Sequence, residues 1–317
     1  LARVSERVQP PFLLELFCGT AGVSQAFVKR GGQALGIDHE LKKHGMLGPA
    51  ARMDLSDSRC QRLILQQVQK ADAVFLAPPC GTASAARSIP ISAAKRAKGV
   101  PQPKPLRTKA SPEGCAGLRG VNRIRVKQAN VLYKFSRAVL EAACAANIPC
   151  IIENPKSSLM WATKWLRDLP RECQFFCVHA CMYGGTRRKS TAFLSNVKLQ
   201  GLSTRCDNNH FHEPWGVEKN QEGRWTFDTA SEAQYPKQLA QAIAAAFLLH
   251  LQAQGIQVQN PGVSDRAAAA IAVEKQPRRL QANLAVSEFG AHVTVRVQGE
   301  PPATIPAASS ARVARRL

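Results

Sequence analysis

The sequence predicts an α/β fold in which helices cover both faces of a doubly wound, mostly parallel β-sheet. Short apolar runs alternate with segments of helical spacing, and each run ends near a glycine, a proline or an acid. Strands of a parallel sheet are buried on both faces, so they read as nearly continuous apolar runs. The chemically useful side chains follow these runs directly. Ligands of open α/β sheets bind beyond the carboxyl ends of the strands, so this placement points to a binding site there.

The individual elements follow from the spacing of the apolar residues. Strands are expected at residues 12–16, 34–37, 73–77, 148–152 and 175–179. A helical stretch through Phe27 connects the first two strands. Apolar side chains between Val131 and Ala143 recur at helical spacing, which predicts a helix over residues 126–146. A double proline ends the third strand, because proline cannot donate to a sheet ladder.

The composition excludes several classes of protein. The chain has 317 residues, 45% of them hydrophobic, so it can bury a large core. Its 43 Lys and Arg against 22 Asp and Glu give a formal net charge of +21, which favours nucleic acid as a partner. The longest nearly apolar stretch, residues 242–251, has about half of the ~20 residues that a membrane helix needs. No membrane partner is therefore expected.

Cysteine usage bears on the compartment. Ten cysteines in a chain of this length indicate free thiols in a reducing compartment rather than a disulfide scaffold. We therefore expect the nucleus if the source is eukaryotic, and the cytoplasm otherwise. The chain begins at Leu1 rather than at Met, and we expect it to be a fragment of a longer polypeptide. The sequence leaves its oligomeric state open.

Three regions differ in composition. Residues 8–255 carry the alternating pattern and are expected to form the main domain. Within it, residues 85–127 hold eleven Lys or Arg and one acid, Glu113, with repeated Pro and Gly, and we interpret them as a mobile basic surface insert. Charges of both signs would mix on an ordinary solvated face, so this insert is predicted to contact phosphates. Residues 256–317 are expected to be a flexible basic tail or linker.

Four polar motifs follow the predicted strands. Residues 14–22 read as a strand, a glycine turn and a helix start, and the glycines let a ligand approach the backbone closely. Asp38 ends the next strand and is placed to hydrogen-bond ribose hydroxyls. Cys80 follows the double proline, which preorganises its loop, and Glu153 follows another strand. Taken singly, each motif also has a structural interpretation, as a tight turn, a surface acid or a buried thiol.

In this order and spacing, the motifs resemble those of the cytosine-C5 DNA methyltransferase family, in a compact form that lacks a large target-recognition domain. The resemblance covers roughly residues 12–250. It is carried by Leu14 to Gly22, Gly36-Ile37-Asp38, Met53-Asp54-Leu55, Pro78-Pro79-Cys80, Glu153-Asn154, Tyr183 to Lys189 and, more weakly, Gln234 to Ala240. It implies a Rossmann-like, class I S-adenosylmethionine-dependent methyltransferase with S-adenosyl-L-methionine as its cofactor and DNA as its substrate.

The resemblance also implies roles for particular residues. The cofactor pocket would be formed by Phe17, Gly19, Thr20, Gly22, Asp38, Asp54 and Pro78. The catalytic residues would be Cys80, Glu153, Arg187 and Lys189. The residues in contact with nucleic acid would be Ser84 and, in the basic insert, Arg87, Lys95, Arg96 and Lys98.

In the implied reaction, Cys80 attacks C6 of cytosine, C5 takes the methyl group, and Glu153 acts at N3 and the exocyclic amine. Arg187 and Lys189 would hold the base carbonyl or a phosphate and lower the pKa of Cys80. The target base has to be flipped out of a duplex, because C5 and C6 are hidden in the stack. Two alternatives stay open: an RNA cytosine-C5 methyltransferase, and a non-catalytic nucleic-acid-binding relative. The presence of both Cys80 and Glu153 speaks for an enzyme.

The sequence departs from the family's pattern in four places. The Gln after the catalytic Cys is Gly81, and the Gln that opens the basic motif is Gly185. The Gly-Asn of the last motif is replaced by Ala240-Gln241. About 40 residues lie between Asn196 and Tyr235, where the family carries its large recognition domain. These departures imply altered sequence recognition and leave the catalytic residues in place.

One group of cysteines and histidines lies outside these motifs. The candidate zinc ligands are Cys181, Cys206, His210 and His212. Their spacing matches no common zinc module, and the neighbouring Cys177 and His179 fall in the strand expected at residues 175–179. The sequence alone therefore leaves this group open, and we assign no metal from it.

Overall fold

The structure is a computed structural model that describes residues 9–41, 45–199, 201–202, 204–229, 231–258, 282–287 and 290–295. The chain divides into two units, Leu1–Asn260 and Pro261–Leu317. Most of the predicted tail, residues 256–317, lies outside the described residues, so its flexibility stays a prediction. In the second unit, strands β10 (Ala282–Ser287) and β11 (Gly290–Val295) form an antiparallel pair.

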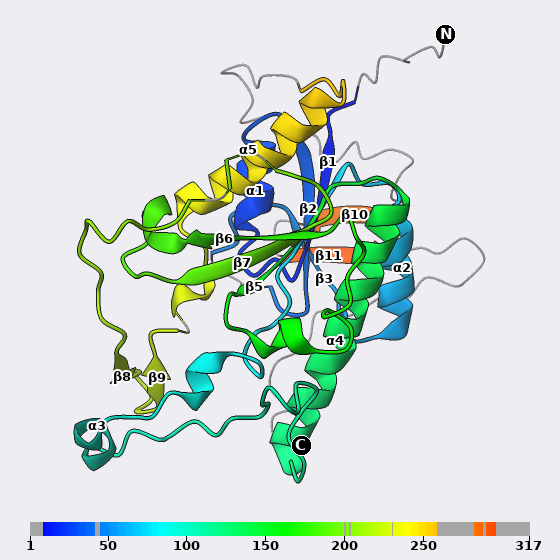
Figure 1. Cartoon of the computed structure of the whole chain (residues 1–317). Coiled ribbons are helices and arrows are strands. Elements are labelled where there is room, and N and C mark those ends of the chain that lie inside the picture. Colours follow the sequence, from blue (N-terminus) through cyan, green and yellow to red (C-terminus); the bar gives the residue numbers. More distant parts are fainter. Residues whose placement is uncertain are drawn as a thin grey trace. The chain divides into compact units, whose positions relative to one another are not determined.

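A seven-stranded sheet forms the centre of the first unit (Figure 1). Its strands lie in the order β3-β2-β1-β4-β5-β7-β6. Their bounds are β1 Phe12–Leu16, β2 Gln33–Asp38, β3 Ala50–Arg52, β4 Ala73–Leu76, β5 Cys150–Pro155, β6 Gln174–His179 and β7 Ser190–Ser195. β7 runs antiparallel to β5 and β6, and the pairs from β3 to β5 are parallel. The mostly parallel sheet is therefore confirmed, and the five predicted strands correspond to β1, β2, β4, β5 and β6.

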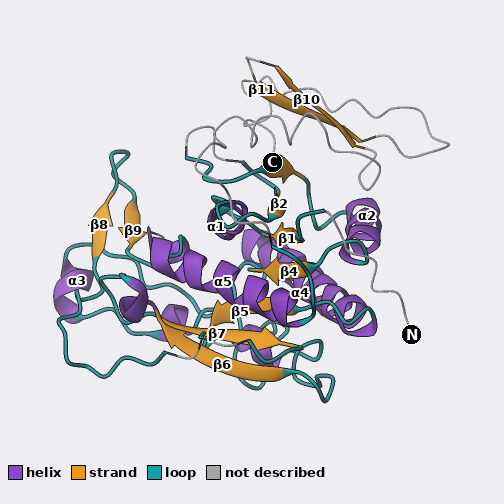
Figure 2. Ribbon diagram, turned by 90° about the horizontal axis from the view of Figure 1, so that it is seen from above, coloured by secondary structure: helices purple, strands orange, loops and turns teal. Residues whose placement is uncertain are grey.

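Helices cover both faces of this sheet (Figure 2). On one face α1 (Gly22–Val28) packs against α5 (Lys237–Ala253), and on the other α2 (Ser58–Val68) packs against α4 (Gly120–Ala145). The apolar stretch noted at residues 242–251 lies in α5, where Ile243 and Phe247 are fully buried in the core. Among the described residues, no helix has the length and apolarity needed to span a membrane. The doubly wound architecture predicted from the sequence is thus confirmed.

The register of the parallel strands brings their carboxyl ends to one level. Leu16 of β1 lies opposite both Ile37 of β2 and Leu76 of β4, and Leu76 lies opposite Ile152 of β5. The chain order reverses at β1, which has β2 on one side and β4 on the other. Such a switch point is where open α/β sheets bind their ligands.

The basic insert predicted at residues 85–127 is shorter and better packed than expected. Residues 120–127 form the first turns of α4. The remainder holds the 3-10 turn η1 (Ala85–Ser88) and the short helix α3 (Ala93–Ala97). Arg107 is only 2% exposed, so the interpretation of the whole segment as a surface insert was wrong at this residue.

Hydrogen bonds explain how a guanidinium is buried in this segment. Arg107 donates to Thr82 Oγ1 at 3.0 Å, to the Pro112 carbonyl at 2.7 Å and to Asn130 Oδ1 at 2.7 Å. It also lies over the ring of Tyr133, 5.1 Å from the centroid. A buried charge is tolerated when its donors are satisfied in this way, so Arg107 fixes the insert to the rest of the domain.

A small hairpin completes the first unit. Strands β8 (Val217–Lys219) and β9 (Trp225–Phe227) pair antiparallel in the segment between β7 and α5. Both views place this hairpin beside α3, although the two segments are far apart in the sequence (Figures 1 and 2).

Candidate active site

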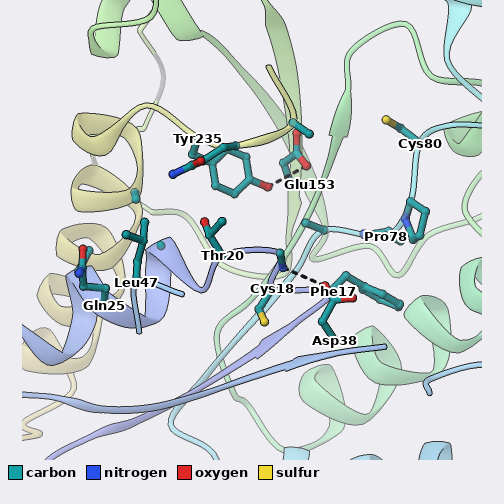
Figure 3. Close-up of a pocket in the computed structure, with 18 of the residues that line it drawn as sticks. Phe17, Cys18, Thr20, Gln25, Asp38, Leu47, Pro78, Cys80, Glu153 and Tyr235 are labelled. Atoms are coloured by element: carbon teal, nitrogen blue, oxygen red, sulfur yellow. Dashed lines mark hydrogen bonds between the residues drawn. The ribbon is translucent and has the colours of Figure 1, made fainter. Parts of the chain in front are cut away.

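A cavity of about 770 Å³ lies at the carboxyl ends of β1, β2, β4 and β5, with the start of α5 on its far side (Figure 3). The predicted site residues that line it are Phe17, Gly19, Thr20, Gly22, Asp38, Pro78, Cys80, Glu153 and Lys189. The structure therefore brings together residues that lie more than a hundred positions apart. Of the residues predicted to bind the cofactor or to act in catalysis, two, Asp54 and Arg187, are not among the described residues that line the cavity.

The loop that carries Cys80 is held from several sides. Asn154 Nδ2 donates to the Pro78 carbonyl at 2.8 Å, and the Tyr133 hydroxyl donates to the Pro79 carbonyl at 2.8 Å. The Cys80 carbonyl accepts a hydrogen bond from the backbone amide of Ser84 at 2.8 Å. Because the prolines also fix φ, the thiol is presented on a rigid loop. Asn154, the residue after Glu153, thus buttresses the loop that carries Cys80.

Glu153 is the buried acid of the cavity, with 7% of its surface exposed. It accepts a hydrogen bond from the Tyr235 hydroxyl at 2.9 Å (Figure 3). Burial raises the pKa of the Glu153 carboxyl above its ordinary value, and the charge of Lys189 and the Tyr235 hydrogen bond lower it in part. Glu153 is therefore placed to hold a proton at a pH at which an exposed glutamate has lost it.

The pKa of Cys80 differs from the sequence-based expectation. Burial raises the pKa of the thiol and the nearby charge of Glu153 raises it further, whereas Lys189 lowers it. The expected lowering of this pKa by a cation of the basic motif is present at Lys189, but burial and Glu153 outweigh it and the net shift is upward. The physical reason is that the thiol is removed from water and faces a carboxyl group. Protonation of Glu153 would remove its negative charge and so favour the Cys80 thiolate. The protonation states of Glu153 and Cys80 are therefore coupled.

Arg187 is engaged away from the cavity. Its guanidinium forms ion pairs with Asp228 at 2.9 Å, Glu232 at 3.0 Å and Glu213 at 3.2 Å, and it lies 5.6 Å from the ring centroid of Trp215. Three carboxylates neutralise this cation, so the structure does not bring it to the thiol. Lys189, two residues on, is the cation of this motif that lines the cavity.

The turn after β1 forms the other half of the cavity. The Gly19 amide donates to Asp38 Oδ2 at 2.9 Å, so the turn is tied to the end of β2 (Figure 3). Gly19 has a φ of +56°, in the left-handed region, and the position of its missing Cβ has no atom within 4 Å. The backbone is thereby left open for a ligand to approach. Asp38 also accepts from the amide and ring nitrogen of His39, both at 2.8 Å.

Asp54 has a local structural role. Its Oδ1 accepts hydrogen bonds from the amide of Ser56 at 2.8 Å and from the Ser56 hydroxyl at 2.7 Å. Asp54 is exposed and is not among the described residues of the cavity wall. Its position therefore gives no support to the predicted contact with the cofactor. Its carboxylate instead stabilises the turn that leads into α2.

The predicted nucleic-acid contacts lie around the mouth of the Cys80 loop and on α3. Arg87 donates to the Gly81 carbonyl at 3.4 Å and to the Lys104 carbonyl at 3.0 Å. Ser84 caps η1, and Arg96 and Lys98 are exposed at α3, where Lys95 is half-buried. The structure therefore places Arg87 beside the Cys80 loop, whereas Lys95, Arg96 and Lys98 belong to α3 and its C-terminal end.

Sequence reasoning missed three functional candidates. Tyr235 was part of a weak motif and carried no role of its own, although it contacts Glu153. Arg125 on α4 lies 3.8 Å from the Cβ position of Gly81, where the family has a Gln side chain. Glu15 is buried in β1 and accepts from the amide and hydroxyl of Ser24, both at 2.6 Å. These three side chains stand out from other residues of their type only by their contacts in the fold, because no spacing in the sequence marks them.

One departure from the family's pattern has a steric reason. A Cβ at Gly185 would lie 2.9 Å from the backbone carbonyl oxygen of Ala180, closer than real Cβ atoms approach. The chain turns back on itself here, and the Gly185 amide donates to that same carbonyl at 3.0 Å. A glutamine at this position would force the turn open, so glycine is required.

The fold and the cavity define a class of protein. The order β3-β2-β1-β4-β5-β7-β6, with β7 antiparallel between β5 and β6, is the Rossmann-like arrangement of class I S-adenosylmethionine-dependent methyltransferases. The cavity lies at the switch point of this sheet, as the class requires. The predicted fold class is thus confirmed.

Comparison with known proteins adds structural likeness alone. Neither a protein-family model nor a curated protein matches the sequence. Similar solved structures include the Dnmt2 methyltransferase of S. pombe (15% identity, TM-score 0.33) and the methyltransferase EhMeth of Entamoeba histolytica (12% identity, TM-score 0.35). A mutant DNMT2 of Spodoptera frugiperda is also similar (13% identity, TM-score 0.32). The matches cover 63%, 66% and 64% of this chain and 53%, 58% and 57% of those chains, respectively. The chain therefore spans little more than half of their length, and the fold assignment rests on the strand order.

Proposed function

We propose that this protein transfers a methyl group from S-adenosyl-L-methionine to C5 of cytosine in DNA, through a covalent adduct between Cys80 and C6. One observation carries the proposal: a thiol on a rigid loop, a buried acid and a lysine line the same cavity as a glycine turn tied to Asp38. The first three groups suit attack on a pyrimidine ring, and the turn suits an adenosyl ligand.

The residues of the turn fit the cofactor. The open backbone at Gly19 would accept a closely packed ligand, and the apolar walls at Phe17 and Pro78 suit an adenosyl group. Asp38 would accept hydrogen bonds from ribose hydroxyls beside the Gly19 amide. When bound, S-adenosyl-L-methionine supplies an electrophilic methyl group. The turn would orient it toward the loop of Cys80.

The chain's own residues account for activation of the base. The Cys80 sulfur forms a bond to C6, and the electron pair of the C5–C6 bond moves toward N3 and C5. Glu153, whose pKa is raised by burial, donates its proton or a hydrogen bond at N3 as that charge develops. C5 would then form the new bond to the methyl group while the bond between that methyl and the sulfonium sulfur breaks, with S-adenosyl-L-homocysteine as the leaving group. Loss of the C5 proton to water and of the Cys80 sulfur from C6 restores the ring.

Charge and exposure support a nucleic-acid substrate. The net charge is +21, the exposed cations Arg96 and Lys98 lie at α3, and the exposed Arg125 of α4 lies beside Gly81 of the Cys80 loop. Lys and Arg that neutralise phosphates release counterions, which drives binding to any sequence. A base stacked in a duplex cannot reach a thiol in a cavity, so the target has to be flipped out.

Trapping with a 5-fluorocytosine oligonucleotide tests the proposal. Fluorine at C5 cannot leave as a cation, so the methylated adduct has no route to elimination. We expect a species that needs S-adenosyl-L-methionine and survives denaturing electrophoresis. Cys80→Ser should abolish this species, because a hydroxyl is a far weaker nucleophile. Cys60→Ser, which changes a half-buried thiol on α2, serves as the matched control and should trap normally.

The acceptor decides between the proposal and its alternatives. DNA and RNA oligonucleotides of one sequence are compared with tritiated S-adenosyl-L-methionine. Label in RNA alone would assign the protein to the RNA cytosine methyltransferases. Binding of DNA without any adduct, repeated with Cys80 intact, would identify a non-catalytic relative.

A further inference from the structure

Four potential metal ligands converge outside the cavity described above. Cys181 belongs to the 3-10 turn η3 (Ala180–Tyr183), and the other three residues lie in the segment between β7 and β8. These three are Cys206, His210 and His212. One sulfur or ring-nitrogen atom of each residue lies within 4.8 Å of all the others.

The distances suit a tetrahedral ion. Cys206 Sγ lies 3.4 Å from His212 Nε2 and 3.8 Å from His210 Nε2. Zinc bonds to sulfur at about 2.3 Å and to nitrogen at about 2.0–2.1 Å, which puts the corners of a tetrahedron about 3.3–3.8 Å apart. The two imidazole rings are 4.6 Å apart, and their Nε2 atoms face the same thiol. Two thiols and two imidazoles are the ligand set of a closed structural zinc site.

The surroundings of the cluster also resemble those of a metal site. The Asn208 amide donates to Cys206 Sγ at 3.3 Å, and Asn208 has a φ of +63°, the left-handed conformation that turns its amide toward the sulfur. Asp207 Oδ1 lies 3.8 Å from His210 Nδ1, on the side of the ring opposite the cluster. Such outer contacts orient metal ligands and favour the thiolate.

We propose that Cys181, Cys206, His210 and His212 bind one zinc ion. All four positions of the ion are filled by protein, so the site is structural. It joins the segment after β7 to η3, which directly precedes the motif of Arg187 and Lys189.

The ion would act on that motif through short contacts. Glu213 follows the last ligand, accepts from the Thr186 hydroxyl at 2.9 Å and pairs with Arg187. Fixing His212 therefore fixes the carboxylate that holds Arg187. Lys189 lies two residues beyond Arg187 and lines the cavity. The zinc site is in this way a scaffold for one wall of the cavity, and it holds the segment in which the family carries its recognition domain.

Metal analysis of the full chain tests the site without any assay of activity. The protein is produced with zinc in the medium, dialysed against metal-free buffer and analysed for zinc per chain. We expect about one zinc per chain, and roughly tenfold less in the double variant Cys206→Ser with His212→Gln. Cys177→Ser, a change of a half-buried thiol on the neighbouring strand β6, is the matched control and should retain the ion.

Cobalt substitution identifies the ligands. Co²⁺ in a site with two thiolates should show intense visible bands of tetrahedral cobalt and a near-ultraviolet band from sulfur to the metal. His210→Gln, which changes an exposed side chain and leaves the core intact, should weaken the visible bands and lower zinc affinity in a chelator competition. This single variant keeps the test decisive if the double variant does not fold.

Three outcomes would overturn the inference. The first is a folded protein that holds no stoichiometric zinc and shows no cobalt bands. The second is full zinc retention by the His210→Gln and the double variants. The third is an intact mass lower by two hydrogens in place of the metal, with peptide mapping that assigns the disulfide to Cys181 and Cys206. None of these outcomes depends on methyl transfer, so the inference and the proposed function can fail separately.

Discussion

At the scale of single residues, the chemistry depends on how Glu153 and Cys80 hold their protons. Burial raises the pKa of both groups, and Lys189 opposes this rise at each of them. A reaction that needs Glu153 protonated and Cys80 deprotonated therefore has two pH limits. Because a thiol ordinarily loses its proton at a much higher pH than a carboxyl group, the lower limit belongs to Glu153 and the upper limit to Cys80. Activity rises up to the raised pKa of Glu153 and falls above the raised pKa of Cys80.

Tyr235→Phe should move the lower of these limits. The hydrogen bond that the Tyr235 hydroxyl donates to Glu153 lowers the pKa of that carboxyl, so removal of the hydroxyl raises this pKa further. The adduct-formation rate should then keep rising to a higher pH before it levels off, while the upper limit stays in place. The measurement is a pH profile of 5-fluorocytosine trapping. Tyr183→Phe, which removes a hydroxyl bonded to Thr204 outside the cavity, is the control. A lower limit that stays in place would contradict the role of Tyr235.

Asp38→Ala and Asp54→Ala should differ in their effect on cofactor binding. Asp38 lines the cavity and holds the Gly19 amide, so its loss should weaken S-adenosyl-L-methionine binding by roughly 1–3 kcal/mol. Asp54 is exposed and bonded to Ser56, so Asp54→Ala should leave the affinity nearly unchanged. Isothermal titration calorimetry measures both. Equal losses would restore the role that the family resemblance implies for Asp54.

At the scale of elements, two buried ionisable side chains connect secondary-structure elements to each other. Glu15 of β1 accepts two hydrogen bonds from Ser24 at the start of α1. Arg107 joins the basic insert to the Cys80 loop through Thr82 and to α4 through Asn130. Both are almost fully buried, so each connection should be visible in the stability of the whole fold.

The stability of the protein should depend on pH through Glu15. Burial raises the pKa of Glu15 from 4.5 to about 7, so the folded protein binds more protons than the unfolded chain between these values. The contribution of Glu15 is present below pH 4.5 and is lost as the pH rises through about 7, a change of roughly 3 kcal/mol.

Glu15→Gln should remove this decline. We expect the free energy of unfolding of the variant, minus that of the wild type, to increase as the pH is raised from about 5 to about 8. Urea unfolding at each pH measures this difference. Glu218→Gln, at an exposed position on β8, should show no such change. A wild-type decline that persists in Glu15→Gln would assign it to another group.

Arg107→Ala should destabilise the fold by about 2–4 kcal/mol, because it leaves Asn130 and the Pro112 carbonyl without their partner and opens a cavity. Lys109→Ala changes an exposed cation of the same segment and should stay within about 0.5 kcal/mol of the wild type. Urea unfolding compares the two. Equal stability of both variants would mean that the insert is not anchored by Arg107.

At the scale of the whole molecule, the net charge of +21 and the exposed cations at α3 favour the binding of a polyanion. Replacing Lys95, Arg96 and Lys98 of α3 by alanine should weaken binding to every DNA sequence and flatten the slope of log K against log salt, by about 0.9 for each phosphate that is no longer neutralised. Fluorescence anisotropy over a salt series measures the slope. Arg59→Ala with Arg62→Ala, on the helix α2, is the control and should leave it unchanged. A slope unaffected by the α3 changes would show that these cations face solvent.

The sequence by itself determined the sheet and most of the cavity. Apolar runs that alternate with helical segments favour parallel strands, and the residue after each parallel strand then lies at the carboxyl edge of the sheet. Phe17, Asp38, Cys80 and Glu153 were predicted on that ground and all line the cavity. The weaker elements β3 and β7 were missed, because a strand of three residues and a strand that begins with Ser-Thr and ends with Ser carry little apolar signal.

Only the tertiary structure decided which neighbours each polar group has. Arg187 and Lys189 are equivalent in the sequence, but three carboxylates from the segment after β7 hold Arg187 while Lys189 reaches the cavity. The same holds for Cys206 and His212, which become candidate metal ligands because the chain returns to η3. The physical reason is range: hydrophobic periodicity is a local property of the chain, whereas ion pairs, pKa shifts and metal sites depend on contacts between residues far apart in it.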